Sequence, residues 1–298
     1  MDTATPVPLP LWKRIADFPL AALAIALGLT IAIVLVTSLP GPQMTRLLGP
    51  GLAQPIGVAV LIALLVVMQK TVMRRLGERK HDDLPLAGAA RGLATGTIAA
   101  FVLFGLIVAV AALLGAYRIA GWGGMTSWVF LLFAAGVGAG FVEEFIFRGI
   151  LFRWIEEFAG SWAALGLTSA LFGLVHIANP GASLFSSFAI AVEAGLMLGG
   201  AYMLTRSLWL PIGIHFGWNV TQGLVWDVPV SGNEVDGLVD AQRVGDPLVT
   251  GGSFGLEASV IALVIAGAFG VWLVWRAAQA GEVMAPRWVR RRAAAQSA

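Results

Sequence analysis

The sequence has no cysteine, which excludes disulfides, thiolate metal sites and a cysteine nucleophile. Charge is also scarce, because Asp, Glu, Lys and Arg make up 12% of the 298 residues, about half of the share usual in soluble domains. Hydrophobic residues make up 58%, and the mean hydropathy is +0.84. This composition excludes an ordinary soluble domain and predicts a polytopic membrane protein.

Eight apolar runs are long enough to cross a hydrocarbon core about 30 Å thick, which takes about 20 helical residues. They lie at about 18–39, 52–68, 92–117, 128–147 with a helical continuation to about 158, 162–178, 184–204, 208–226 and 256–275. The first run lacks a small-residue cleavage site, so we expect a retained helix and not a cleaved signal peptide. The chain is therefore predicted to be all-α, a bundle of about eight transmembrane helices in one integral membrane domain over 1–298.

Positive charge is distributed unevenly between the two sides of these spans. Sixteen Lys and Arg residues fall on the side of both termini, and three, Arg46, Arg118 and Arg243, fall on the other. Because cytoplasmic segments carry the excess of Lys and Arg, we expect both termini, with the basic tail 277–298, to be cytoplasmic in a bacterial cytoplasmic membrane. We expect the tail to lie near anionic lipid and to bind no nucleic acid. The long loop 227–255 is then external, and a lid, a partner surface and a disordered segment are all compatible with its length.

Two adjacent carboxylates and an arginine interrupt the fourth apolar run. Glu143, Glu144 and Arg148 lie within six residues, and an ionised group in hydrocarbon costs about 2.5 to 3.5 kcal/mol on insertion scales. On a helix Glu144 and Arg148 stand at i, i+4 and can pair, so we interpret both as structural. Glu143 points about 100° away from Glu144 and is left unpaired. This carboxylate is the candidate for chemistry.

Two of the three histidines, His176 and His215, also lie inside predicted spans, whereas His81 lies in a charged loop where we expect simple solvation. Phe172 precedes His176 by four residues and Asn219 follows His215 by four, so each histidine shares a helical face with a companion. A single membrane histidine is as often a bond between helices as a functional group. The joint spacing of both histidines with the carboxylate favours a functional site.

The spacing of Glu143 and His176 from Gly160 connects the first histidine with the carboxylate. If the fourth and fifth spans turn at Gly160, Glu143 lies 17 residues before the turn and His176 lies 16 after it. Nearly equal arms bring the two side chains to one level in the membrane. Seventeen residues make about 25 Å of helix, so we expect the tip of the hairpin to extend into the cytoplasm.

The motifs occur in the order Glu143-Glu144-x-x-x-Arg148, Phe172-x-x-x-His176 and His215-x-x-x-Asn219, with the stretch 205–212 leading into the last one. This ordered set resembles the CPBP superfamily of intramembrane proteases, which includes the type II CAAX prenyl endopeptidases and the Abi proteins of bacteria. The resemblance implies an eight-helix membrane fold and peptide hydrolysis by a catalytic core at about 127–226. It also implies roles for the residues: Glu143 would activate water, His176 would help to hold that water, His215 and Asn219 would complete the site or stabilise the oxyanion, and Glu144, Arg148 and Phe172 would be structural.

The chemistry of the residues agrees with that resemblance. Amide hydrolysis needs a water nucleophile, a base and a group that holds the developing oxyanion, and a Glu, two His and an Asn supply all three. Glu143, His176 and His215 also resemble the ligands of hydrolytic zinc sites, where the metal lowers the pKa of bound water to about 7. The zinc-protease motif H-E-x-x-H is absent from the sequence. We favour a glutamate-dependent mechanism without a required cofactor and keep zinc as the alternative.

Two other classes of function fit part of the pattern. A proton- or metal-coupled transporter also places Glu and His in mid-membrane, but the inverted repeats and paired broken helices typical of transporters are not evident. A non-catalytic scaffold or immunity protein could keep the fold without the activity, although the complete set of site residues argues against it. The expected partners are the lipid bilayer and a peptide or membrane-protein substrate. Glu193, alone in the sixth span, is left unassigned between a partner for Arg148 or His215, a cavity-lining group and a residue of misjudged depth.

Overall fold

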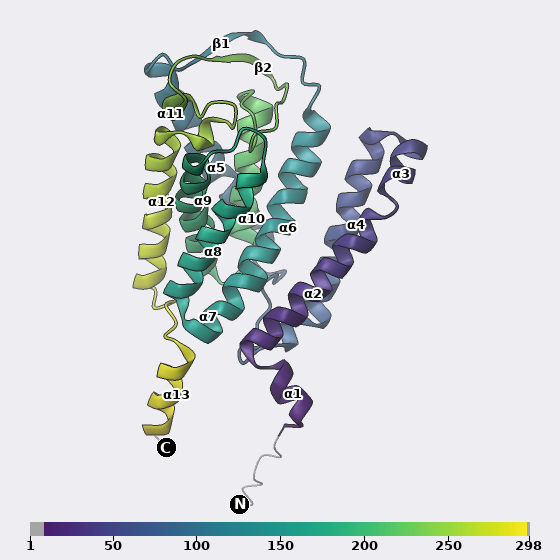
Figure 1. The fold of residues 1–298 in the computed structure, drawn as a ribbon, viewed down its shortest axis with the longest axis vertical. Helices are drawn as coiled ribbons and strands as arrows, with labels where there is room; N and C mark the ends of the chain where they lie inside the picture. The colour runs from purple at the N-terminus through teal and green to yellow at the C-terminus, as the bar shows by residue number, and fades with distance from the viewer. Residues whose placement is uncertain (1–8, 297–298) are drawn as a thin grey trace, which may run out of the picture.

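The structure is a computed structural model that describes residues 9–296, a bundle of tilted helices with a small sheet at one end (Figure 1). The α-helices are, in chain order, α1 (Leu11–Ala16), α2 (Pro19–Ser38), α3 (Gly41–Leu48), α4 (Pro50–Thr71), α5 (Ala89–Leu113), α6 (Gly140–Glu144), α7 (Arg153–Ala159), α8 (Ser161–Val175), α9 (Leu184–Thr205), α10 (Trp209–Val220), α11 (Pro247–Thr250), α12 (Val260–Gln279) and α13 (Arg287–Gln296). The π-helical segments are η2 (Phe130–Ala139), η3 (Phe145–Phe152) and η5 (Thr221–Val225), and the 3₁₀ turns are η1 (Met73–Arg75), η4 (His176–Ala178) and η6 (Leu256–Ala258). The two strands are β1 (Tyr117–Trp122) and β2 (Val239–Arg243).

Seven helical stretches within residues 9–296 are long and apolar enough to cross a membrane. This finding confirms the predicted class, an all-α polytopic membrane protein. The seventh predicted run, 208–226, forms a shorter helix in which the 12 residues of α10 continue into the 5 residues of η5. It packs against α5, α9 and η2, and most of α10 is buried. A helix enclosed by other helices does not have to match the thickness of the hydrocarbon by itself, which explains its shorter length.

The fourth predicted run forms one long helix, Phe130–Ala159, in which a π-helical segment lies on each side of α6. Such wide turns are rare, and they occur often at functional sites. The helix approaches α10 closely at Gly140, where a Cβ atom would lie 3.1 Å from the backbone nitrogen of Phe216. Glycine at this position therefore sets the distance between α6, which carries Glu143 and Glu144, and the helix that carries His215.

The hairpin between the fourth and fifth runs turns at Gly160, which has a φ of +86°. This left-handed conformation favours glycine, and a Cβ atom here would also meet the carbonyl oxygen of Met284 at 2.9 Å. The following helix, α8, ends before Asn179 and Pro180, because proline disfavours helical backbone in the residue before it. The turn at Gly160 and the end of α8 before Asn179 and Pro180 thus both follow the sequence prediction.

The end of the bundle opposite α1 and α13 carries the two-stranded antiparallel sheet, in which Tyr117 of β1 lies opposite Arg243 of β2. Sequence analysis missed this sheet, and it extended the third span to residue 117, whereas α5 ends at Leu113 and Gly115 turns the chain with a φ of +74°. The loop 227–255 contains β2 and α11, so the disordered alternative is wrong. We call this end of the molecule the sheet end, and the opposite one the tail end.

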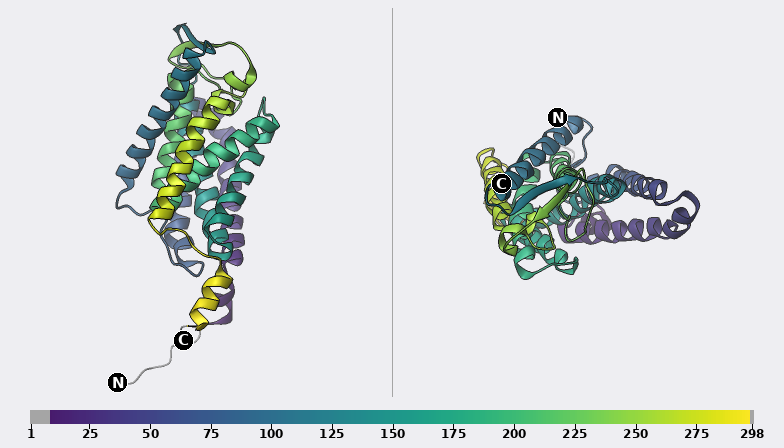
Figure 2. Two further views of the ribbon diagram at one scale, coloured as in Figure 1. Left: turned by 90° about the vertical axis from the view of Figure 1, so that its left-hand side faces the viewer. Right: turned by 90° about the horizontal axis from the view of Figure 1, so that it is seen from above.

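The two ends differ in charge as the sequence pattern predicts. Arg46 of α3, Arg118 of β1 and Arg243 of β2 belong to elements at the sheet end, whereas the Arg-rich helix α13 lies at the tail end, beside α1 (Figures 1 and 2). The two sets of basic residues are therefore separated along the length of the bundle. Which end faces the cytoplasm stays a prediction of the charge rule.

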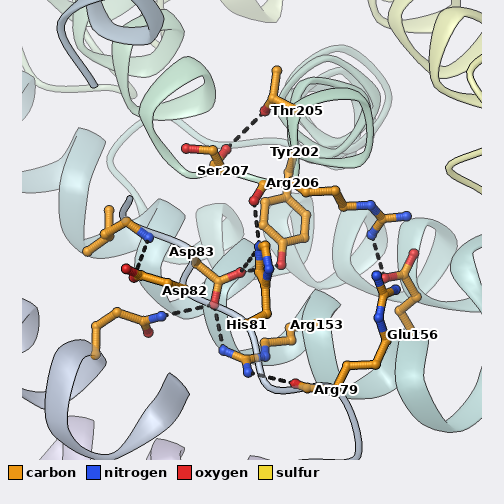
Figure 3. Close-up of polar contacts among 12 residues, drawn as sticks. Arg79, His81, Asp82, Asp83, Arg153, Glu156, Tyr202, Thr205, Arg206 and Ser207 are labelled. Carbon is orange, nitrogen blue, oxygen red and sulfur yellow. Dashed lines mark hydrogen bonds and ion pairs between the residues drawn. The ribbon is translucent and has the colours of Figure 1, made fainter. Parts of the chain in front are cut away.

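A polar network closes the tail end (Figure 3). The buried carboxylate of Asp83 accepts hydrogen bonds from Arg153 at 2.6 Å, Tyr202 at 2.7 Å and Gln69 at 3.1 Å. His81, for which we expected simple solvation, instead lies 2.6 Å from the carbonyl oxygen of Arg206 and 3.7 Å from Asp83. This tail-end network joins the loop before α5 to α4, α7 and α9.

Arg206 extends the tail-end network to the C-terminal segment. It donates to Glu156 at 2.6 Å and to Glu282 at 3.0 Å, and Ser161 donates to the same Glu156 carboxylate at 2.5 Å. Burial alone would lower the pKa of the Arg206 guanidinium, but Glu156 and Glu282 hold that pKa above its ordinary value. Through Arg206, the segment before α13 is thereby linked to the hairpin tip. This contact between segments of the protein is additional to the lipid contact that we expected for the tail.

Candidate active site

The predicted site residues come together where α6, α8, α9 and α10 approach one another. A cavity of about 40 Å³ lies there, and Phe172, His176, His215 and Asn219 all contribute to its lining. We call it the site cavity. Its further lining residues are Ile190, Glu193, Ala194, Met197, Leu198, Trp218, Ser231 and Glu257. Four of the positions that sequence analysis singled out therefore share one small buried space, although they come from two separate helices.

Glu143 faces His215 from the opposite helix. Its Oε2 atom lies 4.0 Å from Nε2 of His215, and 33% of its side chain is exposed. The same Oε2 atom is itself buried and has no hydrogen-bond partner. A distance of 4.0 Å is too long for a direct hydrogen bond, and it matches the separation of two atoms bridged by one water molecule, to which each bond is about 2.8 Å. This is the geometry that a base and a nucleophilic water require.

Glu144 is completely buried and holds two partners with one oxygen. Its Oε1 atom accepts from Nη1 of Arg148 at 2.9 Å and lies 3.0 Å from Nδ1 of His215. The pair with Arg148 is the one that the i, i+4 spacing allows. The contact with His215 was not expected from the sequence. It fixes the imidazole ring so that Nε2 points toward Glu143. Glu144 therefore links the structural arginine to the candidate site.

Phe172 lies between the two histidines. Its ring centroid is 4.8 Å from that of His176 and 6.1 Å from that of His215, and the guanidinium of Arg148 lies 4.8 Å from the same centroid. Nδ1 of His176 lies 2.6 Å from the carbonyl oxygen of Phe172, which leaves Nε2 as its free ring nitrogen. Phe172 thus sets the spacing of the two imidazoles and is more than a filler of core volume.

Asn219 is anchored to the helix that precedes α6. Its Nδ2 atom donates to the carbonyl oxygen of Ala135 at 2.8 Å, and the residue is 6% exposed. An amide nitrogen carries two hydrogens, so one donor remains after this bond. That remaining donor and Nε2 of His215 are the polar groups of α10 available to a substrate oxygen.

Sequence analysis missed one acidic residue of the site and left another unassigned. Glu257 of η6 and Glu193 of α9 both line the site cavity, and they are 5% and 2% exposed. Arg148 bonds the carbonyl oxygen of Ala194 at 3.1 Å, so within the described residues it is not a partner of Glu193. Of the open alternatives, Glu193 is a cavity-lining group. The signal for Glu257 was a single carboxylate at the start of the last apolar run.

The expected sharing of one water by Glu143 and His176 stays a prediction. Among the described residues, the ion-pair contact of Glu143 is made with His215, and none is made with His176. His176 lies directly after the end of α8, at the first position of η4. Both histidines contact Phe172, so His176 belongs to the same cluster without touching the carboxylate.

The residues proposed as zinc ligands do not fit a zinc ion in this arrangement. Within residues 9–296, no three His, Asp or Glu side chains form a group that could hold a metal. In a tetrahedral site with bonds of 2.0 to 2.2 Å, neighbouring ligand atoms lie about 3.3 Å apart, whereas Glu143 and His215 are separated by 4.0 Å. We therefore derive no step through a metal.

Comparison with known proteins supports the family resemblance. Residues 125–221 match the family model described as Type II CAAX prenyl endopeptidase Rce1-like. Comparisons with curated proteins and with solved structures gave no significant match. The matched segment begins just before η2 and ends at the start of η5, so it includes Glu143, His176, His215 and Asn219. The match confirms the resemblance that the ordered motifs indicate, and it spans the helices that carry the candidate site.

Proposed function

We propose that this protein is a glutamate-dependent intramembrane endopeptidase that hydrolyses a peptide bond of a peptide or membrane-associated protein. The observation that carries the proposal is the pair of Glu143 and His215, whose facing atoms are 4.0 Å apart with an unpartnered carboxylate oxygen on one side. A structural ion pair would close that distance. A site that places a water between the two groups requires that this distance stay open.

In the proposed mechanism Glu143 takes a proton from the water as its oxygen attacks the carbonyl carbon of the scissile bond. His215 acts as an imidazolium, in which Nδ1–H donates to Glu144 and Nε2–H donates to the oxyanion, and the remaining Asn219 amide donor is the second group that holds the oxyanion. Collapse of the tetrahedral intermediate breaks the C–N bond, and Glu143 returns the proton to the leaving amine. His176 contributes to holding the water or the substrate from the other side of Phe172.

The test is cleavage of a pool of short peptides by the purified protein in proteoliposomes, with products identified by mass spectrometry. We expect cleavage by the wild type and none by Glu143→Gln. A flux assay for protons and divalent cations on the same vesicles serves as the control. Flux that depends on Glu143, without any cleavage, would show that the carboxylate serves transport and would sink the proposal.

The same proposal places both ends of the chain in the cytoplasm and the sheet end outside, because of the uneven Lys and Arg distribution. We expect a membrane-impermeant thiol reagent to label a cysteine introduced at Asn233 in intact cells, and to label one at Gln279 only after permeabilisation. Labelling of position 279 in intact cells would reverse the orientation. The absence of natural cysteines makes the background low.

A further inference from the structure

Two carboxylates that the proposed mechanism does not use face the site cavity. Glu193 comes from the middle of α9 and Glu257 from the turn before α12, so they are 64 positions apart in the chain and meet only in the fold. Both side chains line the same cavity of about 40 Å³. The residues that line the cavity include no Lys or Arg, and Arg148, which donates to the carbonyl oxygen of the lining residue Ala194, is paired with Glu144.

The two carboxylates differ in how they are held. Glu257 is fixed, because the backbone N–H of Ser231 donates to its Oε1 at 2.5 Å and the indole N–H of Trp218 donates to its Oε2 at 3.4 Å. Glu193 is 2% exposed, and its buried Oε2 has no partner. An unsatisfied carboxylate oxygen in a buried polar cavity costs free energy unless a ligand supplies the missing donor. The arrangement is therefore an incomplete site, with one carboxylate preset and the other open.

The size of the cavity restricts the ligand. Its volume of about 40 Å³ is room for about three water molecules, taking the ~10 to 15 Å³ that each needs. An ammonium group is about the size of a water molecule and carries three donors, whereas a guanidinium is a larger planar fork. The neighbours on one side are the catalytic candidates His176, His215 and Asn219, so a group bound here lies next to the reacting bond.

We propose that Glu193 and Glu257 form a specificity subsite that binds a primary ammonium group of the substrate, such as a lysine side chain close to the scissile bond. This inference rests on the proposed function, because the subsite shares its cavity with the residues proposed for catalysis. It goes beyond that function in naming the chemistry of the substrate. A charged amine between the two acids supplies the donor that Glu193 lacks and balances charge that no lining Lys or Arg balances.

Binding is measured first, so that the subsite can be judged apart from catalysis. The probes are fluorescent peptides of randomised sequence in which one central position is lysine, its uncharged near-isostere norleucine, or arginine. The protein is full-length Glu143→Gln in nanodiscs, which binds without turnover. We expect the lysine pool to bind at least about tenfold more tightly than the norleucine pool, or ~1.4 kcal/mol, with the arginine pool intermediate. Glu193→Gln in this background should abolish the lysine preference. The control is Glu234→Gln, because Glu234 is an exposed acid of the loop 227–255 that does not line the cavity, and this variant should keep the preference.

Cleavage then separates the two levels of inference. With catalytically competent protein, we expect Glu193→Gln to lower the ratio of kcat/KM for lysine peptides to that for norleucine peptides by about tenfold or more, whereas Glu234→Gln leaves this ratio unchanged. Equal binding of lysine and norleucine pools, or a preference that survives in both Glu193→Gln and Glu257→Gln, would overturn the subsite, since His176 or a proton shared by the acids would then balance the charge. A lysine preference in binding without cleavage of any pool would instead overturn the proposed hydrolysis and leave the subsite standing.

Discussion

The site cavity and the tail-end network use the same kinds of side chain in opposite ways. At the tail end, Asp83 accepts three hydrogen bonds, and Glu157 accepts the backbone N–H groups of Glu78 and Arg79 at 2.9 and 3.1 Å. Around the site the situation is reversed. In the part of the chain that the structure describes, the buried carboxylate oxygens without a hydrogen-bond partner belong to Glu143, Glu144 and Glu193.

This difference separates architecture from function more clearly than burial or charge does. Both regions are deeply buried and rich in acids, so neither property alone identifies the site. A buried polar group normally finds a partner, and an exception needs an explanation. Satisfied acids at the tail end hold loops together, whereas we assign the unpartnered oxygens of Glu143 and Glu193 to water and substrate. Four predictions test whether this division is correct.

The largest effect is expected for Glu143→Gln. This change keeps the shape of the side chain but removes the base, so activity should fall by about 10²- to 10⁴-fold. Because a partly buried acid is removed, thermal stability in detergent should stay near the wild-type value or rise. Both are measured on one preparation, with His176→Ala as the companion variant that should also lose activity and stay folded. Normal cleavage by Glu143→Gln would assign the chemistry to another group.

Glu144→Gln should affect stability and activity together. It leaves Arg148 without its counter-charge in a buried position, and breaking such a pair costs about 3 to 5 kcal/mol. It also releases the His215 ring, so kcat of the folded fraction should fall as well. The measurements are the detergent melting temperature and the kcat per folded protein. If Glu144→Gln stays as stable as the wild type, the pair with Arg148 contributes little and the structural role assigned to it is wrong.

Asp83→Asn is the matched change in the tail-end network. It removes the charge opposite Arg153, with which Asp83 makes a buried pair at 2.6 Å, so a stability loss of similar order, about 3 kcal/mol, is expected. The asparagine can keep part of the hydrogen bonding to Tyr202 and Gln69, so the loss should be at the lower end of the range. Cleavage per folded protein should not change. A selective loss of kcat in this variant would erase the distinction between the two regions.

Removal of metal should leave the cleavage activity unchanged, which is the smallest of the four expected effects. Because no three potential ligands within residues 9–296 form a group that could hold a metal, protein dialysed against a chelator should retain its cleavage activity. Elemental analysis of the same sample confirms that zinc has been removed. Loss of activity on stripping, followed by recovery with about one equivalent of Zn²⁺, would reverse the preference for a glutamate-dependent mechanism.

The sequence predicted the long apolar helices and the ordering of the site motifs well, because length, hydropathy and i, i+4 spacing are local properties. It did not predict that Glu144 bonds His215, since that contact depends on how closely α6 approaches α10. It also left out Glu257, whose carboxylate accepts the backbone N–H of Ser231 from the loop 227–255. These misses share one cause: each depends on packing between segments that are far apart in the chain.

The strands β1 and β2 were missed for a related reason. Tyr117 ends an apolar run and so looked like the last residue of a helix, while its partner Arg243 lies in a loop with no strong alternation of polar and apolar residues. Pairing with a distant segment decided the outcome. His81 shows the same limit for a polar residue, since its contact with Arg206 joins two parts of the chain that lie 125 residues apart.

Gly140 has a wider consequence for how this site tolerates change. Because α6 and α10 meet there backbone to backbone, the separation of Glu143 from His215 is set mainly by the main chain and only secondarily by the choice of side-chain rotamer. A substitution at residue 140 would touch no reacting group, yet its Cβ atom would push against the backbone of α10 at Phe216, which would have to give by a few tenths of an ångström. The spacing that a water molecule needs is thus encoded in the residue with no side chain.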